Sequence, residues 1–197
     1  MISLLIYIKH SFPAIWFLAE KFNGLICRFR YPQLRDISEQ VGNSYIHEGY
    51  SFSRMNCGDI DEILELINSQ SDEYMSHFNP HNFDKKTFQS MINNGSYAVM
   101  KASDSDSGKI VGYFFLRLFF VGKAFHGLMT DEQFSNRGIG SSMWKISQEI
   151  CRKLGIRMFA TIHSGNKASL LSAKKACGLI KERELKNNYL LVEFCQE

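Results

Sequence analysis

The sequence lacks the features that mark a secreted, metal-binding or nucleic-acid-binding protein. Its five cysteines are odd in number and include no Cys-x-x-Cys pair, which argues against a disulfide framework and against a zinc site. The formal net charge is only +3, and no run of lysines and arginines indicates a nucleic-acid-binding surface. We therefore expect reduced thiols in a cytoplasmic protein that binds neither a metal nor nucleic acid.

Long hydrophobic runs are missing as well. Residues 1–30 contain two apolar segments, MISLLIYI and FPAIWFLA, separated by three polar residues. Neither segment reaches the roughly 18 to 20 residues that a membrane-spanning helix needs. A secretory signal would carry positive charge before its apolar run and a small-residue cleavage site after it, and both are absent. Pro13 suits the first turn of a helix that runs to about Phe29.

The role of this N-terminal extension stays open between two interpretations. One is a helix that packs on the rest of the protein or on a second subunit as a homodimer contact. The other is a peripheral membrane contact through residues 1–30, because four basic residues stand among the aromatic ones: Lys9, Lys21, Arg28 and Arg30. The following polar stretch, Tyr31 to Glu48, contains Pro32 and Gly42 and is predicted to be a linker. We accordingly divide the chain into an extension with linker, 1–48, and a domain, 49–197.

Length and composition predict a soluble globular domain. The chain has 197 residues, of which 45% are hydrophobic and 22% charged, and this suffices for one well-buried core. From Tyr50 onward, hydrophobic periodicity predicts the order β, α, α, β, β, β, α, β, α, β, β. No internal repeat competes with this order.

The most informative stretch runs from Leu128 to Leu154. An apolar strand ends near Thr130, a polar turn with Gly138 and Gly140 follows, and the chain then becomes an amphipathic helix. A glycine-rich turn that leads into a helix leaves backbone N–H groups free at the positive end of the helix dipole, where phosphate binds. Glycine also lets a ligand approach the backbone closely.

Two common phosphate loops do not fit this turn. The Rossmann fingerprint needs a third glycine where Met143 stands, and the P-loop sequence Gly-Lys-Ser/Thr is absent. The segment Ser135–Gly140 instead resembles the acyl-CoA pyrophosphate loop of the GCN5-related N-acetyltransferases (GNAT), written Arg/Gln-x-x-Gly-x-Gly/Ala. Ser135 departs from that pattern. Ile110–Tyr113, and Asn166–Ser169 followed by Ala176–Leu179, resemble further family segments. The order of strands and helices also matches the family's fold from about Tyr50 to the C-terminus, roughly three quarters of the chain.

The resemblance implies a fold and a cofactor. The fold is α/β (α+β), with a mixed, mostly antiparallel central sheet of about six to seven strands flanked by about four helices, plus the N-terminal helical extension. Acetyl-CoA would be the acyl donor, with no metal. By resemblance, the pantetheine arm would be bound by Leu128, Met129 and Thr130. The pyrophosphate would be bound by Asn136, Arg137, Gly138, Ile139, Gly140 and Ser141. Asn166 and Ser169, near the start of the late helix, would also contact the cofactor.

The implied reaction is transfer of an acetyl group to a primary amine of a small molecule by direct attack, which needs a base for the amine and a proton for the leaving thiolate. Candidate bases are His81, His126 and Glu132, in that order, and His163 is a further histidine near the site. Each of them has the alternative of being an ordinary polar residue. Many family members carry a tyrosine on the late helix as proton donor. Lys174 stands there instead, so Ser172 or a water would substitute.

Two alternatives remain at this level. The missing tyrosine and Ser135 also fit an acyl-CoA-binding regulatory domain with little or no activity. The acceptor is unknown; an amino sugar is one hypothesis, because the strand near Ile110–Val121 is rich in aromatic residues that could stack on a ring. A covalent enzyme intermediate is not expected, because Cys151 and Cys177 both suit core positions.

Overall fold

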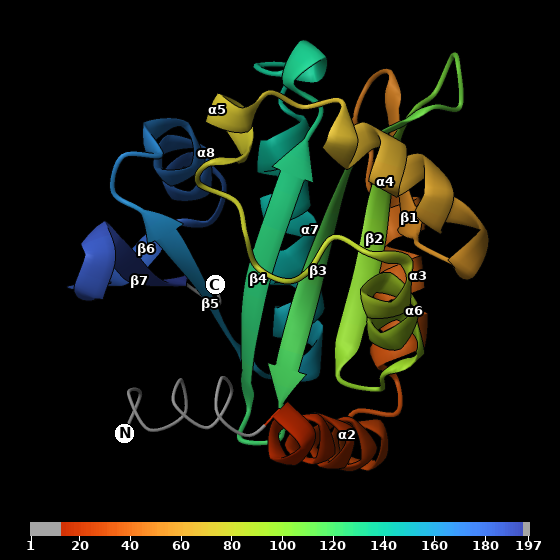
Figure 1. Cartoon of the computed structure of the whole chain (residues 1–197), viewed down its shortest axis with the longest axis vertical. Helices are drawn as coiled ribbons and strands as arrows, with labels where there is room; N and C mark the ends of the chain where they lie inside the picture. Colours follow the sequence, from red (N-terminus) through yellow and green to blue (C-terminus); the bar gives the residue numbers. More distant parts are fainter. Residues whose placement is uncertain (1–12, 195–197) are drawn as a thin grey trace.

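A seven-stranded sheet forms the centre of the structure, a computed structural model that describes residues 13–194 (Figure 1). The strand order is β1-β2-β3-β4-β5-β7-β6, and every neighbouring pair is antiparallel except β4 and β5. The strands are β1 Tyr50–Arg54, β2 Tyr97–Asp104, β3 Ile110–Phe119, β4 Lys123–Thr130, β5 Arg157–His163, β6 Leu179–Glu184 and β7 Tyr189–Phe194. This confirms the predicted mixed, mostly antiparallel sheet.

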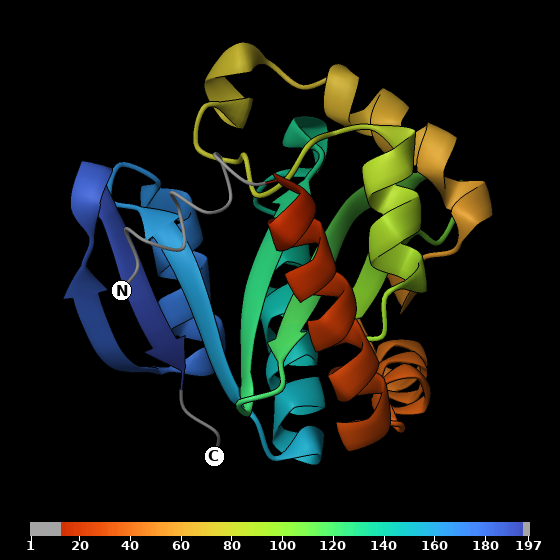
Figure 2. The same ribbon diagram turned by 60° about the horizontal axis from the view of Figure 1, so that its bottom comes forward.

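Helices cover both faces of this sheet. Figures 1 and 2 show α4 and α6 over one face and α7 behind the other; α3 and α8 pack beside α7, and α2 contacts β3. The helices of the described chain are α2 Pro13–Arg30, α3 Leu34–Ser44, α4 Ile60–Asn68, α5 Asp72–Met75, α6 Lys85–Asn93, α7 Ile139–Leu154 and α8 Lys167–Cys177. The structure is therefore a three-layer α/β/α arrangement.

The aromatic strand β3 lies at the centre of both hydrophobic cores. Its alternate side chains point to opposite faces of the sheet: Phe114 and Leu116 join the core beneath α7, whereas Tyr113 and Phe115 join the core beneath α4 and α6. A strand that is buried on both faces has an almost continuous apolar sequence. The aromatic residues of β3 are thus core residues.

The prediction that residues 31–48 form a linker without regular structure is wrong. Residues 34–44 form helix α3, which packs on β1 and α7 and buries Leu34, Ser38, Val41 and Gly42. The apolar residues of this segment recur every three to four positions, which is the pattern of an amphipathic helix. The prediction failed because it was based on the polar composition of the segment. The division of the chain at residue 48 remains a prediction.

The predicted N-terminal helix is confirmed as α2, Pro13–Arg30. The first 12 residues of the predicted extension lie outside the described part. Among the described residues, no helix combines the length and the apolar character needed to cross a membrane.

Candidate active site

The candidate active site lies where strands β4 and β5 separate. The two strands are paired over only three positions, Lys123–Phe125 with Arg157–Phe159. Beyond these positions β5 pairs only with β7, while β4 pairs only with β3 as far as Thr130. The edge of β4 that faces β5 therefore offers unpaired backbone N–H and C=O groups to a ligand.

Two residues in the left-handed conformation turn the chain from β4 into α7. Asn136 has a φ of 62° and Gly138 a φ of 82°, and α7 begins at Ile139. Gly138 has no side chain to cap the helix, and no acidic residue occupies the first turn. The first N–H groups of α7 therefore lack intrahelical partners and lie at the positive end of the helix dipole, where they can bind a phosphate group.

The strand edge and the helix N-terminus open into one cavity of about 650 Å³, a size suited to a cofactor or substrate. Most of the predicted cofactor-binding residues line it: Leu128, Met129, Thr130, Asn136, Gly138, Ile139, Gly140, Ser141, Asn166 and Ser169. Arg137 does not. Its guanidinium lies 4.7 Å from the centre of the Phe134 ring and its Nη1 lies 3.4 Å from the Tyr50 hydroxyl, so it contacts the loop from outside the cavity.

A pocket of buried polar groups forms the base of the cavity, between β4 and α7. The ring centroids of His126 and Trp144 lie 4.1 Å apart, and His126 is only 6% exposed. Within the described chain, both ring nitrogens of His126 and the Nε1 of Trp144 are buried without a hydrogen-bond partner. A buried, unpaired donor costs about 1–3 kcal/mol. A ligand that accepts a hydrogen bond here would remove that cost.

Comparison of the sequence with known families agrees with this geometry. The Acetyltransferase (GNAT) family matches residues 63–179, more than half of the chain. The chain belongs to the GNAT family. A sequence comparison with curated proteins finds no match.

Several solved GNAT structures have the same fold at low sequence identity. The GNAT domain of S. lividans PAT has a TM-score of 0.64 and 16% identity, covering 74% of this chain and 89% of that chain. The paia N-acetyltransferase from Thermoplasma acidophilum in complex with coenzyme A has a TM-score of 0.61 and 16% identity, covering 74% and 98%. The spermidine N-acetyltransferase from Vibrio cholerae in complex with CoA and spermine has a TM-score of 0.59 and 14% identity, covering 75% and 94%.

The loop Ser135–Gly140 has a short side chain at its first position. Ser135 lines the cavity where the family pattern has Arg or Gln, and its side chain is too short to reach far into it. On the opposite wall, the Oδ1 of Asn166 accepts a hydrogen bond from the Ser169 N–H at 3.0 Å and caps α8. Lys175 of α8 also lines the cavity, as its one lysine or arginine within the described chain.

His81 lies outside the cavity. Its Nδ1 is 2.9 Å from the backbone carbonyl oxygen of Asn82, and its Nε2 is 3.3 Å from the Tyr113 hydroxyl. The rings of Phe88 and Phe115 pack against it, and burial lowers the pKa of His81. His81 is half-buried and is absent from the cavity lining, so its position does not support the base role, which stays a prediction.

The two other candidate bases, His126 and Glu132, both line the cavity, but one is buried and the other is exposed. Burial lowers the pKa of His126 to about 3, so His126 is neutral at pH 7 and suited to hydrogen bonding rather than to holding a proton. Glu132 is exposed, and its Oε2 accepts a hydrogen bond from the Ser71 Oγ at 2.9 Å. Its backbone N–H donates to the Oε1 of Gln70 at 2.7 Å. Glu132 is therefore held at the end of β4 with its carboxylate open to water.

Three aromatic residues that line the cavity were not predicted as site residues from the sequence: Tyr74, His77 and His163. The Tyr74 hydroxyl donates to the backbone oxygen of Thr130 at 2.8 Å. His77 stacks on His163 with ring centroids 4.7 Å apart, and the Nδ1 of His163 accepts a hydrogen bond from the Gly165 N–H at 3.1 Å. These contacts either join segments that are distant in sequence or depend on the conformation of a loop. No local sequence pattern predicts them.

The thiols of Cys151 and Cys177 are not activated. Burial raises the pKa of Cys177 to about 12 and that of Cys151 beyond the usual range, and neither residue lines the cavity. A thiol that stays protonated is a poor nucleophile. In the described part of the chain, no cluster of three or more His, Cys, Asp or Glu residues is arranged to hold a metal ion.

Proposed function

We propose that this GNAT protein is an acetyl-CoA-dependent N-acetyltransferase that acts on a primary amine of a small molecule by direct attack, in the cytoplasm. One observation carries the proposal: the free edge of β4 and the open N-terminus of α7 meet in a single cavity. An elongated molecule with an amide-containing arm and a pyrophosphate matches both features at once.

The donor would be bound mainly by backbone groups. Leu128–Thr130 would pair with the pantetheine arm, and the N–H groups of Ile139–Ser141 would hold the pyrophosphate, with Lys175 adding a positive charge. The thioester end would then approach His126 and Trp144. There the unpaired N–H of Trp144 would meet an acyl oxygen, which relieves the cost of a buried donor.

The reaction forms one bond, breaks another and moves protons on the amine and on the leaving thiolate. The substrate ammonium first gives up a proton, and Glu132 with a bound water is the group at the cavity edge that can accept it. The amine nitrogen then bonds to the carbonyl carbon, and the bond from that carbon to sulfur breaks. The nitrogen releases its second proton to solvent, which also restores any proton that Ser172 donates. The leaving thiolate takes a proton from the Ser172 hydroxyl or from water; Ser172 lines the cavity on α8, the helix on which other family members carry tyrosine.

A cationic amine is the acceptor that the charges favour. Glu73 and Glu132 both line the cavity and are exposed, so they attract a protonated amine from solution. The similar Vibrio cholerae enzyme, which is named for spermidine, was solved with spermine. The aromatic residues of β3 do not line the cavity, so the observation that favoured an amino sugar no longer supports it.

Thermal unfolding with and without acetyl-CoA tests the cofactor part of this proposal. At a hundredfold excess over its dissociation constant, a ligand of the native state adds about 2.7 kcal/mol of stability and raises the midpoint by several degrees. Gly138→Glu should abolish the shift, because it places a carboxylate at the phosphate site. Gly155→Glu is the matched control: Gly155 also has a positive φ, at the other end of α7, and this variant should keep the shift.

A thiol-release assay tests the catalytic part. We expect CoA release with polyamines and other small cationic amines. Glu73→Gln should raise KM alone, whereas Glu132→Gln should raise KM and also lower kcat, because it removes the proton acceptor. The regulatory alternative makes the opposite prediction, acetyl-CoA binding without thiol release for any amine in a broad panel. Release with a nucleotide-linked amino sugar alone would revive the amino sugar hypothesis.

A further inference from the structure

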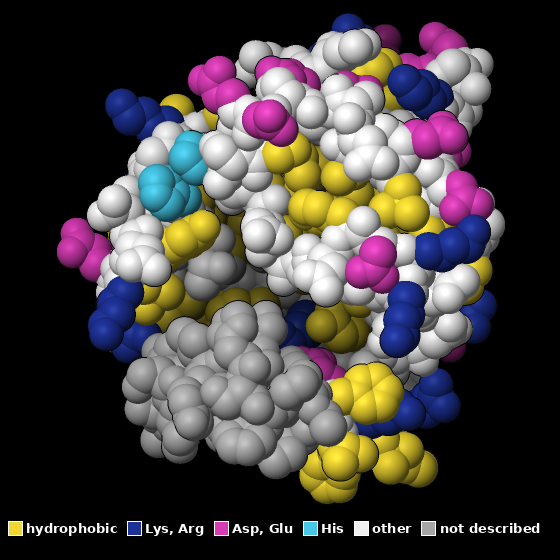
Figure 3. Space-filling model, viewed as in Figure 1, with side chains coloured by type: hydrophobic (Ala, Val, Ile, Leu, Met, Phe, Trp, Pro, Cys, Tyr) yellow, Lys and Arg dark blue, Asp and Glu magenta, His cyan; other side chains and the backbone are white. Residues whose placement is uncertain are grey.

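Helix α2 exposes its apolar face. Leu18, Phe22, Leu25 and Phe29 recur at steps of four, three and four, which places them on one side of the helix. Their exposed fractions are 64%, 63%, 53% and 78%. Figure 3 shows hydrophobic side chains gathered at the lower edge of the molecule, where Figure 1 places α2.

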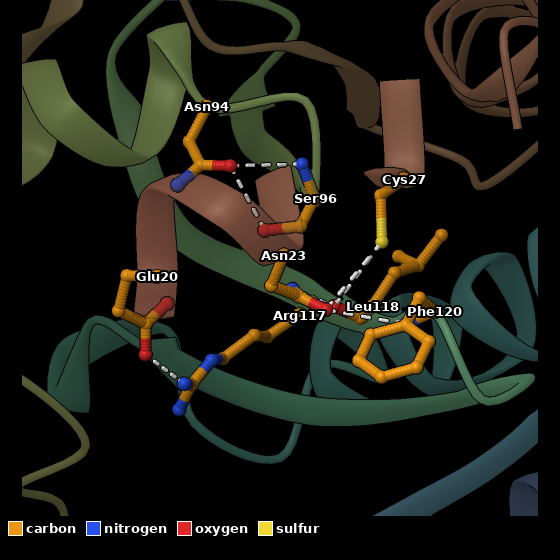
Figure 4. A network of polar contacts seen from close by, with 8 residues as sticks. All are labelled: Glu20, Asn23, Cys27, Asn94, Ser96, Arg117, Leu118 and Phe120. Carbon is orange, nitrogen blue, oxygen red and sulfur yellow. Dashed lines mark hydrogen bonds and ion pairs between the residues drawn. The ribbon is translucent and has the colours of Figure 1, made fainter. Parts of the chain in front are cut away.

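The opposite face of α2 is polar and points inward. Glu20 forms an ion pair with Arg117. The Nδ2 of Asn23 donates to the Leu118 carbonyl oxygen at 2.8 Å, and its Oδ1 accepts from the Phe120 N–H at 3.2 Å. Figure 4 shows these contacts converging between α2 and the end of β3. Ordinary surface helices bury the apolar face, so α2 has the reverse orientation.

Close packing fixes this orientation. A side chain at Gly24 would meet the Oδ1 of Asn94 at 2.1 Å, and one at Gly95 would meet the backbone oxygen of Gly24 at 2.8 Å. Cys27 is fully buried, and its Sγ lies 3.8 Å from the Leu118 carbonyl oxygen. Rotating α2 to bury its apolar face would break the paired polar contacts and separate these surfaces. The outward apolar face is thus built into the fold.

The turn between β3 and β4, which is hydrogen-bonded to α2, carries two more exposed apolar residues. Phe120 and Val121 are 45% and 60% exposed, and Phe120 is bound to Asn23 of α2. We call the exposed apolar residues of α2 and this turn the α2 surface. It includes Phe17, Leu18, Phe22, Leu25, Phe29, Phe120 and Val121, which are seven of the nine large hydrophobic residues that are exposed in the described chain. A gathering of this kind marks a site of interaction.

The charges beside the α2 surface are positive. Lys21, Arg28, Arg30 and Lys123 are exposed around it, whereas the acid of α2, Glu20, is engaged with Arg117. Two copies of this surface placed face to face would bring cations together with no free acid on the helix to neutralise them. A negatively charged partner is the complementary one.

We propose that the α2 surface docks on an anionic lipid membrane. An amphipathic helix with basic residues beside exposed Phe and Leu lies in the plane of the membrane interface, with its apolar side chains among the lipid chains and its cations at the phosphates. In Figure 1, α2 lies at the end of the sheet opposite to α5 and to the N-terminus of α7. Docking on α2 therefore leaves the cavity open to water, and the protein stays active on a soluble amine.

Vesicle flotation with the full-length protein tests this proposal and needs no enzymatic activity. The probe is a vesicle of phosphatidylcholine with about one third phosphatidylglycerol, compared with pure phosphatidylcholine. Wild type should bind the anionic vesicle more tightly. Phe22→Ser/Phe29→Ser should weaken binding at least about tenfold, because two large apolar groups are lost. Lys21→Gln/Arg28→Gln should weaken it about thirtyfold at low salt, from roughly 1 kcal/mol for each basic residue near the surface.

The matched control is Ile46→Ser/Leu171→Ser. Both residues are large, apolar and as exposed as those of α2, at 94% and 68%, but they lie outside the α2 surface. This variant should bind vesicles like wild type, and all variants should unfold at similar temperatures. Wild type that stays free of anionic vesicles overturns the proposal. So does a dimer in sedimentation velocity that Phe22→Ser/Phe29→Ser dissociates, since a second copy would then occupy the surface.

Discussion

Helices α7 and α2 are the two longest of the described chain, with 16 and 18 residues, and they use amphipathicity in opposite ways. The apolar residues of α7, among them Met143, Ile146 and Ile150, are fully buried against the sheet. Leu18, Phe22, Leu25 and Phe29 of α2 face outward, and Asn23 holds the helix to β3. The spacing of apolar residues shows which residues share a face of a helix. Which face points inward depends on the residues of the sheet that the helix packs against.

The polar groups of the two helices also differ in their pairing. Asn23 of α2 has protein partners for both its amide atoms. Trp144 of α7 is buried with no partner for its Nε1 among the described residues. The paired groups of α2 stabilise the fold, whereas the unpaired group of α7 lines the cavity and is available to a ligand. This contrast gives four predictions, ordered by size.

The largest effect is expected from truncating matched apolar residues. Ile146→Ala should lower the free energy of unfolding by about 2–5 kcal/mol, because it leaves a cavity in the core. Phe22→Ala removes a larger side chain but should change stability by no more than about 0.5 kcal/mol, because that side chain is exposed. Urea unfolding at pH 7 measures both. Equal losses in the two variants would mean that the α2 face is buried in solution.

The second effect concerns the polar contacts of α2. Asn23→Leu should lower the free energy of unfolding by about 2–3 kcal/mol, because the Leu118 carbonyl and the Phe120 N–H lose their partner. Lys21→Leu, on the exposed side of the same helix, should stay within about 0.5 kcal/mol. If Asn23→Leu were neutral, the inward polar face would not hold the helix in place.

A third effect appears as pH dependence. The pKa of His126 is about 3 in the folded state, against about 6.5 in an unfolded chain. As pH falls below about 6.5, the unfolded chain takes up a proton that the folded chain still refuses. His126 therefore lowers stability by about 2 kcal/mol between pH 7 and pH 5. His126→Phe should flatten the stability curve by that amount; a curve of unchanged slope would contradict the burial of a neutral imidazole.

The smallest effect on stability is expected at Trp144. Trp144→Phe removes the unpaired N–H and keeps most of the apolar contacts, so the ligand-free protein should change by less than about 1 kcal/mol. The same variant should bind acetyl-CoA more weakly, as measured by titration calorimetry. Weaker stability with unchanged acetyl-CoA binding would assign Trp144 to the core alone.

The conformation of the segment from the end of β4 into α7 was largely predictable, because its signals are local. The strand end at Leu128–Thr130, the turn through Gly138 and the start of α7 are consecutive in sequence, and their conformations follow from glycine chemistry and helix periodicity. The contacts of Glu132, Tyr74 and His77 around the cavity were not predictable. Glu132 meets Ser71 across 61 positions, Tyr74 meets Thr130 across 56, and His77 stacks on His163. No periodicity links such partners.

The sequence by itself determined the order of strands and helices, the loop that leads into α7 and the existence of helix α2, because backbone propensity, glycine and hydrophobic spacing act over a few residues. Only the tertiary structure decided that His81 lies outside the cavity, that His126 is buried and neutral, that residues 34–44 form a helix of the core, and that α2 turns its apolar face outward. Burial and hydrogen-bond pairing depend on residues distant in the chain, and these set both the charge of a histidine and the face that a helix exposes.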